Sequence, residues 1–278
     1  MATKDSLGDR MKEFYENRAK QYLTRKMPVM IRIDGKAFHS FTKGFSRPYD
    51  ELFHNAMNST LQYLCKNIQG CKFGYTQSDE ISLVLTDLDT LTTDGWFDYG
   101  VQKMCSVAAS MATLQFNRAF AEEVNKWFQS KITVESAEEY ELGTADLYER
   151  YNKSIIKGAM FDARVFSIPE EEVVNCFIWR QQDATRNAIQ MLGQTHFSHK
   201  QLEGRSCNDI QDMLFIEKNI NFNDMPIEFK RGVCCYKAQV PTIERLIGYK
   251  TEWVLDKECP VFTQDREYIE KHLVRKAS

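Results

Sequence analysis

The chain has 278 residues, of which 43% are hydrophobic and 27% are charged, and its formal net charge is −3. This composition excludes a disordered or fibrous protein, and the charge excludes one that binds nucleic acid through positive charge spread over its whole surface. The 8 cysteines, none in a CxxC pair, are too few for a disulfide scaffold and are expected to be reduced. We expect no secretory leader, no membrane span and a cytoplasmic location.

Charge is unevenly distributed along the chain. Residues 1–50 contain an excess of Lys and Arg, and residues 120–172 contain an excess of Asp and Glu. The first 20 residues predict a charged helix. An apolar, β-branched run at 28–35 predicts a strand that ends at the turn-forming pair Asp34-Gly35. The molecule is therefore expected to have a basic end and an acidic end.

The following segments continue an alternation of strands and helices. Apolar residues at helical spacing predict a helix over 49–67, and two apolar runs around a polar tip at 77–80 predict a hairpin over 72–85. A long amphipathic helix is predicted over 96–129 and a strand over 159–168. Strand, helix, hairpin, helix, strand is the order of a ferredoxin-like βαββαβ unit, so we predict an α+β fold of this type.

The last third of the chain predicts a helix over 171–192 and a late hairpin formed by 231–240 and 250–256. We therefore divide the chain into a ferredoxin-like unit at 1–170 and a C-terminal α+β extension at 171–278.

The predicted topology brings acidic side chains together. The first and third strands of a ferredoxin-like sheet are neighbours, so Asp34 should lie beside Asp79 and Glu80 of the hairpin tip. Converging carboxylates repel each other unless a cation neutralises them, and hard oxygen ligands suit Mg²⁺ shared with substrate phosphates. Two such ions would suit nucleotidyl transfer, as in polymerases or nucleotide cyclases. Each motif taken alone is also what a solvent-exposed turn selects.

Basic residues follow the first of these carboxylates. Lys36 and His39 come directly after Asp34, and Lys43 and Arg47 follow. Backbone amides after a strand end, with such side chains nearby, can hold a triphosphate. A basic cluster is more often a solvated surface, but its position beside the expected metal site favours a phosphate-binding role.

A zinc site at His196, His199 and Cys207 is a weaker possibility. Their spacing matches no standard pattern of zinc ligands and the fourth ligand is missing, so we expect no zinc there.

Three motifs resemble those of one family. Residues 32–41 (RIDGKAFHSF) match RxDGxxFHxF, residues 75–82 (YTQSDEIS) match YxQSDExS, and residues 179–183 (WRQQD) match WRQxD. Residues 223–226 (NDMP) and 229–232 (FKRG) extend the match. Together they make the chain resemble the tRNA-histidine guanylyltransferase family.

The resemblance covers about residues 10–240 and implies a polymerase-like palm domain. Members of this family activate the 5′ end of a tRNA with ATP or GTP and then add nucleotides to it in the 3′–5′ direction. The resemblance implies that Asp34 and Asp79 bind two Mg²⁺ ions, that the Gly35 carbonyl completes one site, and that Glu80 supports catalysis electrostatically. It also implies a tetramer, with residues 171–278 contacting tRNA and other subunits.

The resemblance further implies which residues meet the substrates. Asp50 occupies the position of a residue that reads the guanine edge. The residues implied to line the nucleotide triphosphate are Asp34, Gly35, Lys36, Ala37, Phe38, His39, Ser78 and Asp79. The implied contacts to phosphates or tRNA are Arg32, Arg47, Lys103, Arg180 and Asn187.

Two departures from the eukaryotic pattern indicate a branch of the family. Residues 185–188 read Thr-Arg-Asn-Ala where eukaryotic members have His-Ile-Asn-Asn, and Gly100 stands where they have Arg. Both features resemble the bacterial and archaeal branch, which repairs 5′-truncated tRNA by template-directed addition. We therefore expect tRNA repair, with addition of the extra guanosine to histidine tRNA as a further possibility.

Two alternatives remain at this point. A nucleotide cyclase of the same palm architecture needs no tRNA, but its GGDEF or GGEEF signature is absent. A non-catalytic RNA-binding protein would have little reason to keep Asp34, Asp79 and Glu80 together, because clustered acids repel RNA phosphates.

Overall fold

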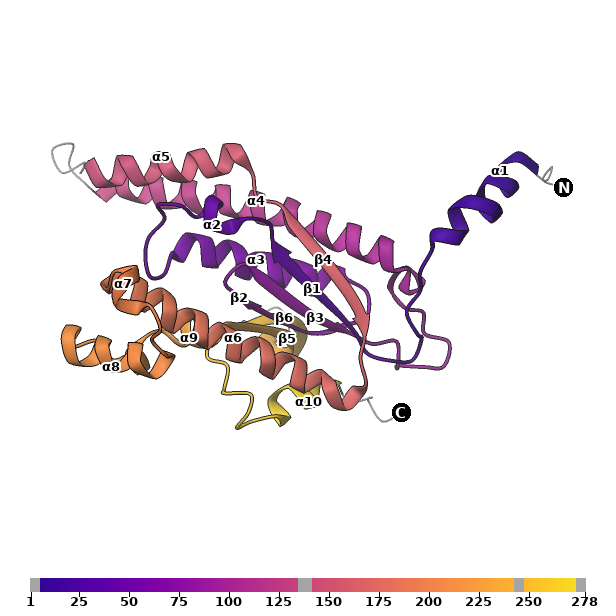
Figure 1. Ribbon diagram of the computed structural model, residues 1–278. Coiled ribbons are helices and arrows are strands. Elements are labelled where there is room, and N and C mark those ends of the chain that lie inside the picture. Colours follow the sequence, from indigo (N-terminus) through magenta and orange to yellow (C-terminus); the bar gives the residue numbers. More distant parts are fainter. Residues whose placement is uncertain (1–5, 135–141, 243–247, 274–278) are drawn as a thin grey trace.

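The computed structural model describes residues 6–134, 142–242 and 248–273, which form helices around one antiparallel sheet (Figure 1). Within these ranges the sheet has six strands in the order β4-β1-β3-β2-β5-β6. The strands are β1 (Val29–Gly35), β2 (Cys71–Gln77), β3 (Glu80–Leu85), β4 (Phe161–Ser167), β5 (Val233–Thr242) and β6 (Gly248–Asp256).

The four strands β4-β1-β3-β2 have the ferredoxin-like order, with β1 and β3 paired antiparallel at the centre. Their register places Asp34 opposite Glu80. The predicted α+β palm-type fold is therefore confirmed, and so is the expectation that the first and third strands are neighbours. The late hairpin is also confirmed, and because β5 pairs with β2 it continues the same sheet.

The α-helices of the described residues are α1 (Ser6–Met11), α2 (Phe38–Phe41), α3 (Glu51–Asn67), α4 (Val101–Val134), α5 (Leu142–Lys157), α6 (Glu170–His196), α7 (His199–Leu202), α8 (Cys207–Lys218), α9 (Ile227–Arg231) and α10 (Glu267–Leu273). The helices predicted over 49–67, 96–129 and 171–192 correspond to α3, α4 and α6. Within the described residues, the charged N-terminal helix that was predicted corresponds to α1 and the helical turns at Lys12–Ala19. A separate turn at Trp96–Tyr99 precedes α4, because Phe97 and Asp98 have left-handed φ values of 52° and 51°. The long helix therefore begins later than predicted, and α5 and α8 were not predicted.

Helices cover both faces of the sheet. Figure 1 shows α3 and α4 on one face and α6 on the other. The strand β1 illustrates the reason: Val29, Ile31 and Ile33 are buried in the core that contains α3 and α4, whereas Met30 belongs to the core that contains α6. Successive side chains of a strand point to opposite faces, so this apolar run contributes to both cores.

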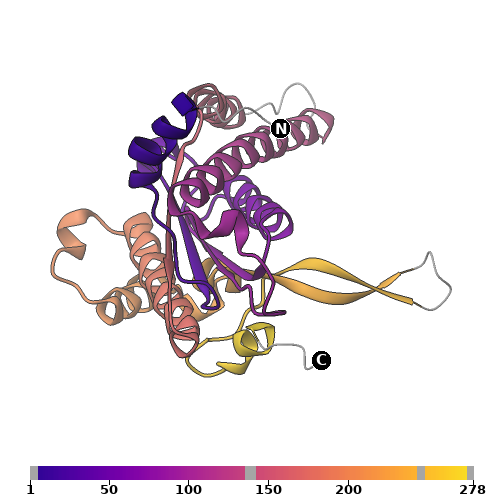
Figure 2. The ribbon, with the colours of Figure 1, turned by 90° about the vertical axis from the view of Figure 1, so that its right-hand side faces the viewer.

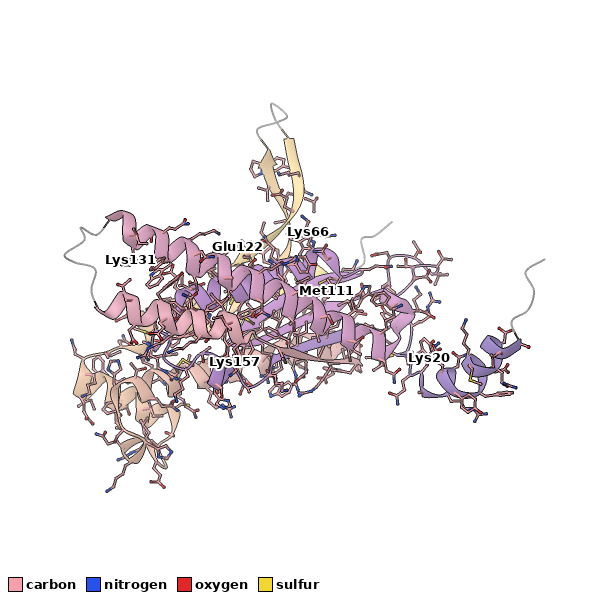
Figure 3. All side chains as sticks on the ribbon, turned by 90° about the horizontal axis from the view of Figure 1, so that it is seen from above. Lys20, Lys66, Met111, Glu122, Lys131 and Lys157 are labelled. Carbon is pink, nitrogen blue, oxygen red and sulfur yellow. The ribbon has the colours of Figure 1, made fainter. Side chains whose placement is uncertain are left out.

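Two segments extend away from this body. The hairpin of β5 and β6 reaches outward beyond the rest of the sheet (Figure 2). At another edge, α1 and the helical turns at Lys12–Ala19 bury none of their residues. Figure 3 shows Lys20 where this N-terminal arm joins the body, well away from Lys157 at the end of α5. No helix in the described ranges has the length and apolar character needed to cross a membrane.

Candidate active site

The loop after β1 brings Asp34 to the edge of the sheet. β1 ends at Gly35, whose backbone N–H donates to the Asp79 carbonyl at 3.1 Å. A Cβ on Gly35 would lie 2.3 Å from the Phe38 ring, so only glycine fits this approach. Ala37 then adopts a left-handed φ of 56° and turns the chain into the short helix α2. The sequence thus ties the Asp34 loop to the β2–β3 turn.

The β2–β3 turn presents the second carboxylate. Ser78 has a left-handed φ of 48°, and its hydroxyl donates to Asp79 Oδ1 at 3.2 Å. Asp79 follows this tight turn directly before β3, next to Glu80, which pairs with Asp34 in the register. Asp34 and Asp79 therefore approach each other from two neighbouring strands, as the topology predicted.

The charges at this point are not balanced within the protein. Burial raises the pKa of the Asp79 carboxyl to about 6, and the negative charge of Asp34 contributes in the same direction. Among the described side chains, no Lys or Arg forms an ion pair with Asp34 or Asp79. Two neighbouring carboxylates without a cationic side chain are an arrangement that a bound cation would relieve.

The donor set fits Mg²⁺ in chemistry. The Asp34 and Asp79 carboxylates and the Gly35 carbonyl are hard oxygen ligands, and Mg²⁺ is commonly held by one or two carboxylates together with substrate phosphates. Within the described ranges there is no group of three or more His, Cys, Asp and Glu side chains that could hold a metal by themselves. The remaining ligands of a Mg²⁺ ion bound here would be water molecules and phosphate oxygens of the substrate.

Glu80 is engaged elsewhere. Arg180 Nε on α6 donates to Glu80 Oε1 at 2.6 Å, and Arg180 Nη2 donates to Asp183 at 2.8 Å. Burial raises the pKa of Glu80, although the charge of Arg180 opposes this effect. The centre of the Trp179 ring lies 4.4 Å from the Arg180 guanidinium carbon. Glu80 thus fixes α6 against the sheet behind Asp79, and the Arg180 side chain is buried rather than open to tRNA.

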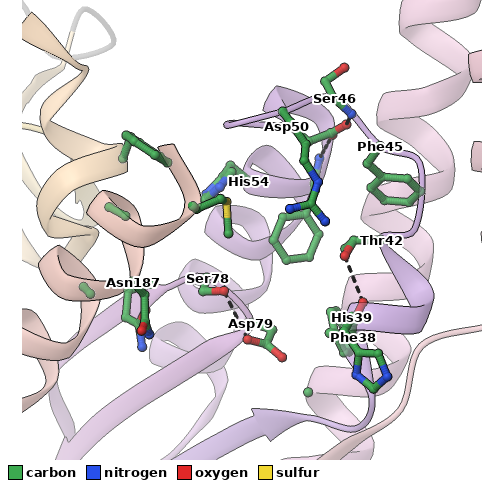
Figure 4. Close-up of a pocket in the computed structure, with 18 of the residues that line it drawn as sticks. Phe38, His39, Thr42, Phe45, Ser46, Asp50, His54, Ser78, Asp79 and Asn187 are labelled. Carbon is green, nitrogen blue, oxygen red and sulfur yellow. Dashed lines mark hydrogen bonds between the residues drawn. The ribbon is translucent and has the colours of Figure 1, made fainter. Parts of the chain in front are cut away.

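A pocket of about 540 Å³ opens beside the two carboxylates (Figure 4). The figure shows Asp79 and His39 toward one end of it and Asp50 and Ser46 toward the other. The predicted residues that line the pocket are Asp34, Gly35, Ala37, Phe38, His39, Arg47, Asp50, Ser78, Asp79 and Asn187. The predicted residues outside its lining are Arg32, Lys36, Glu80, Lys103 and Arg180.

One wall of the pocket consists mostly of residues that were not predicted from the sequence. Besides Asn187, α6 contributes Ala184, Ala188, Met191 and Gln194, and α9 contributes Glu228 and Phe229. The α6 residues recur at the spacing of one helix face, which is a signal that the sequence did contain. His54 lies one turn after Asp50 on α3 and also lines the pocket. Burial lowers the pKa of His54 to about 3, so this imidazole is neutral at pH 7.

Two predicted phosphate contacts lie outside the pocket but have aromatic neighbours. The Arg32 guanidinium carbon on β1 lies 5.5 Å from the centre of the exposed Trp179 ring. Lys103 is exposed near the start of α4, with its Nζ 4.9 Å from the centre of the Phe97 ring. Their contacts with phosphates stay predictions.

Comparison with known proteins assigns a family to this geometry. The family model described as tRNAHis guanylyltransferase matches residues 8–169. A solved bacterial tRNA(His) guanylyltransferase-like protein in complex with ATP is 41% identical, with a TM-score of 0.78 and coverage of 97% of this chain and 99% of that chain. A bacterial structure of the same description in complex with GTP is 38% identical, with a TM-score of 0.75 and the same coverage.

A relative with a curated function is the tRNA(His) guanylyltransferase of Saccharomyces cerevisiae. It is 29% identical over 220 residues, which cover 73% of this chain and 80% of the relative. The family model spans more than half of the chain and contains both Asp34 and Asp79. The chain therefore belongs to the tRNA(His) guanylyltransferase family of nucleotidyltransferases.

Proposed function

We propose that this chain is a Mg²⁺-dependent 3′–5′ nucleotidyltransferase that activates the 5′ end of a tRNA with ATP or GTP and then adds nucleotides to it. The observation that carries the proposal is the approach of Asp34 and Asp79, from neighbouring strands, at the edge of a pocket large enough for a nucleotide. The similar bacterial structures that contain ATP and GTP support it.

Different residues of the chain would bind the metal ion and the triphosphate. The carboxylates of Asp34 and Asp79 and the Gly35 carbonyl would hold Mg²⁺, which would supply positive charge against the phosphates when bound. The loop from Gly35 to His39 lines the pocket beside them, and its sharp turn at Ala37 suits backbone contact with a triphosphate. Lys36 and His39 are exposed at this loop and add donors for phosphate oxygens.

The proposed reaction has two nucleotidyl steps. The 5′ monophosphate of the tRNA attacks the α-phosphorus of ATP or GTP and displaces pyrophosphate. The 3′-hydroxyl of the incoming nucleoside triphosphate then attacks the activated 5′ phosphorus and displaces the nucleoside monophosphate. Glu80 and Arg180 are not among the residues that line the pocket, and they pair with each other, so we assign them the positioning of the hairpin that carries Asp79.

Repair of 5′-truncated tRNA by template-directed addition is the form of this activity that we favour. Its support is the sequence at 185–188 and Gly100, which resembles the bacterial branch, and the two bacterial neighbours. Addition of the extra guanosine to histidine tRNA would use the same chemistry. The tetramer, the division at residue 170 and the cytoplasmic location stay predictions.

Extension of a truncated tRNA tests this proposal. A 5′-monophosphorylated tRNA that lacks its first nucleotide is incubated with the protein, Mg²⁺, ATP and GTP, and full-length histidine tRNA serves as the second substrate. We expect one added nucleotide on the truncated tRNA, no product in EDTA, and no product with a folded Asp79→Asn variant. A cyclic dinucleotide formed without tRNA, or no extension at all, would contradict the proposal.

A further inference from the structure

The carboxylate of Asp50 faces the nucleotide pocket but is already occupied by donors of the protein itself. Asp50 caps the start of α3, where its Oδ1 accepts the Phe53 N–H at 3.0 Å. Its Oδ2 accepts both the Ser46 N–H at 3.0 Å and the Tyr151 hydroxyl at 2.7 Å. Figure 4 shows Ser46 and Asp50 side by side at this end of the pocket. Only 6% of Asp50 is exposed.

Tyr151 is held firmly in this contact. It lies on α5, 101 residues along the chain from Asp50, and only 2% of it is exposed. Its ring meets the Phe45 ring edge-on at 4.9 Å and the Trp127 ring at 5.5 Å. Burial and the neighbouring Asp50 both raise the pKa of the phenol, so the hydroxyl keeps its proton and remains a donor.

The count of acceptor positions has a consequence for base recognition. A carboxylate offers about four acceptor positions, two on each oxygen. Guanine presents a parallel pair of donors, N1–H and the N2 amino group, which a carboxylate binds through both oxygens at once. Adenine presents an acceptor at N1 instead. With Oδ2 filled by Ser46 and Tyr151, Asp50 has one position left on Oδ1 and cannot make the paired contact.

We propose that the Tyr151 hydroxyl sets the base selectivity of the nucleotide pocket by withholding Oδ2 of Asp50 from the base. Tyr151 is a positioning residue that touches Asp50 and not the nucleotide. The pocket of this chain then accepts adenine and guanine nucleotides alike. This inference rests on the proposed nucleotide-binding function of the pocket, and it accords with the similar bacterial structures that contain ATP in one case and GTP in the other.

An unselective pocket fits the proposed chemistry. The activating nucleotide is used only as a leaving group, so its base carries no information. The base that is added is chosen by pairing with the opposite strand of the tRNA, and a pocket that enforced guanine would obstruct the other three choices.

Removal of one hydroxyl tests the inference. Dissociation constants of GTP and ATP are measured with the full chain and Mg²⁺, without tRNA. Tyr151→Phe frees one acceptor position on Oδ2 for the guanine base. The affinity for GTP relative to that for ATP should therefore be about tenfold higher in this variant than in the wild type. Tyr148→Phe is the matched control, because Tyr148 is on the same helix and its ring stacks on Phe128 with the ring centres 3.7 Å apart. Removal of the Tyr148 hydroxyl should leave the ratio of GTP to ATP affinity unchanged.

A coupled variant and a second nucleotide complete the design. In an Asp50→Asn background, Tyr151→Phe should have no effect on the ratio. Inosine triphosphate lacks the N2 amino group, so wild-type protein should bind it within about threefold of GTP, and Tyr151→Phe should separate the two. This wild-type comparison needs no substitution that could disturb folding.

The outcomes separate this inference from the proposed function. An unchanged GTP:ATP ratio in a folded Tyr151→Phe protein, or a wild type that binds GTP tenfold more tightly than inosine triphosphate, would overturn the inference alone. Normal binding of both nucleotides without extension of tRNA would overturn the proposed function alone. A wild type that binds neither nucleotide would overturn both.

Discussion

Arg180 on α6 donates a 2.6 Å hydrogen bond from Nε to Oε1 of Glu80, the residue that follows Asp79 in the chain. The two side chains are buried, with exposures of 8% and 9%. The pair therefore connects the α6 wall of the pocket to the hairpin that carries Asp79, the second of the two carboxylates that we propose to be catalytic. Its geometry links the stability of the fold to the position of Asp79.

Loss of the guanidinium should be costly. Arg180→Met leaves the Glu80 carboxylate buried without its counter-ion, so we expect the free energy of unfolding to fall by about 3 to 5 kcal/mol. Urea denaturation followed by circular dichroism measures this change. Arg186→Met is the matched control, since Arg186 lies on the same helix and also pairs with Asp183, but its side chain is 60% exposed. Its loss should cost less than about 1 kcal/mol. Equal losses of unfolding free energy in Arg180→Met and Arg186→Met would contradict the conclusion that the buried pair of Arg180 and Glu80 is the important one.

The stability of the protein should depend on pH because the Asp79 carboxyl is buried and lies close to the charge of Asp34. Because the pKa of this carboxyl is raised to about 6 in the folded protein, its stabilising contribution is present below pH 4 and is lost as the pH rises through 6. Asp79→Asn removes the unfavourable charge. In metal-free protein at pH 7.5 the variant should therefore be more stable than the wild type by about 2 to 3 kcal/mol, and this advantage should vanish near pH 4.

The control for this prediction lies on the neighbouring strand. Asp162 on β4 pairs with Asp34 in the register, but its side chain is 56% exposed, so Asp162→Asn should leave the pH profile unchanged. Addition of Mg²⁺ should raise the melting temperature of the wild type and not that of Asp79→Asn. If Asp79→Asn lowered stability at pH 7.5 in EDTA, burial and repulsion from Asp34 would not be the dominant effects.

The close approach at Gly35 makes another prediction. Gly35→Ala forces the new Cβ against the Phe38 ring, which already packs against Phe116 at 5.5 Å and Phe161 at 5.0 Å. We expect a loss of about 1 to 3 kcal/mol in stability and weaker nucleotide binding, because the loop must move. Gly143→Ala on α5 meets nothing within 4 Å and should instead stabilise its helix slightly. Thermal melts and nucleotide titrations would compare the two variants. If Gly35→Ala changed neither stability nor nucleotide binding, the close contact between Gly35 and the Phe38 ring would not be required.

The convergence of Asp34 and Asp79 could be predicted because it follows from topology. Once the element order indicates a ferredoxin-like unit, β1 and β3 must be neighbours, and acids at the end of one and the start of the other meet. Alternation along β1 and the polar tip of the hairpin are local signals. The family motifs contain Asp34 and Asp79 as well, so the topology and the family resemblance predict the same site.

The contacts made by Arg180 and Asp50 could not be predicted in the same way. Arg180, Asp183 and Asn187 are three and four residues apart along α6, which puts them on one face of the helix. Which neighbour this face meets depends on how the helix is rotated against the sheet. Arg180 is directed at Glu80, 100 residues away. The family resemblance implies that Asp50 reads the base, and its contact with Tyr151 depends on α5. This helix was not predicted, although Leu147, Tyr151 and Ile155 recur at helical spacing and pack into the core.

The fate of the γ-phosphate of GTP tests the central claim most directly. In 3′–5′ addition the incoming nucleotide attacks through its 3′-hydroxyl and keeps its triphosphate as the new 5′ end, whereas in 5′–3′ addition that triphosphate is cleaved. We predict that γ-³²P-labelled GTP, supplied with ATP, Mg²⁺ and a 5′-monophosphorylated tRNA lacking one guanosine, transfers its label to the tRNA at early times, and that Asp34→Asn and Asp79→Asn proteins transfer none. Label found only in pyrophosphate or phosphate, with nucleotides added at the 3′ end or not at all, would contradict the account.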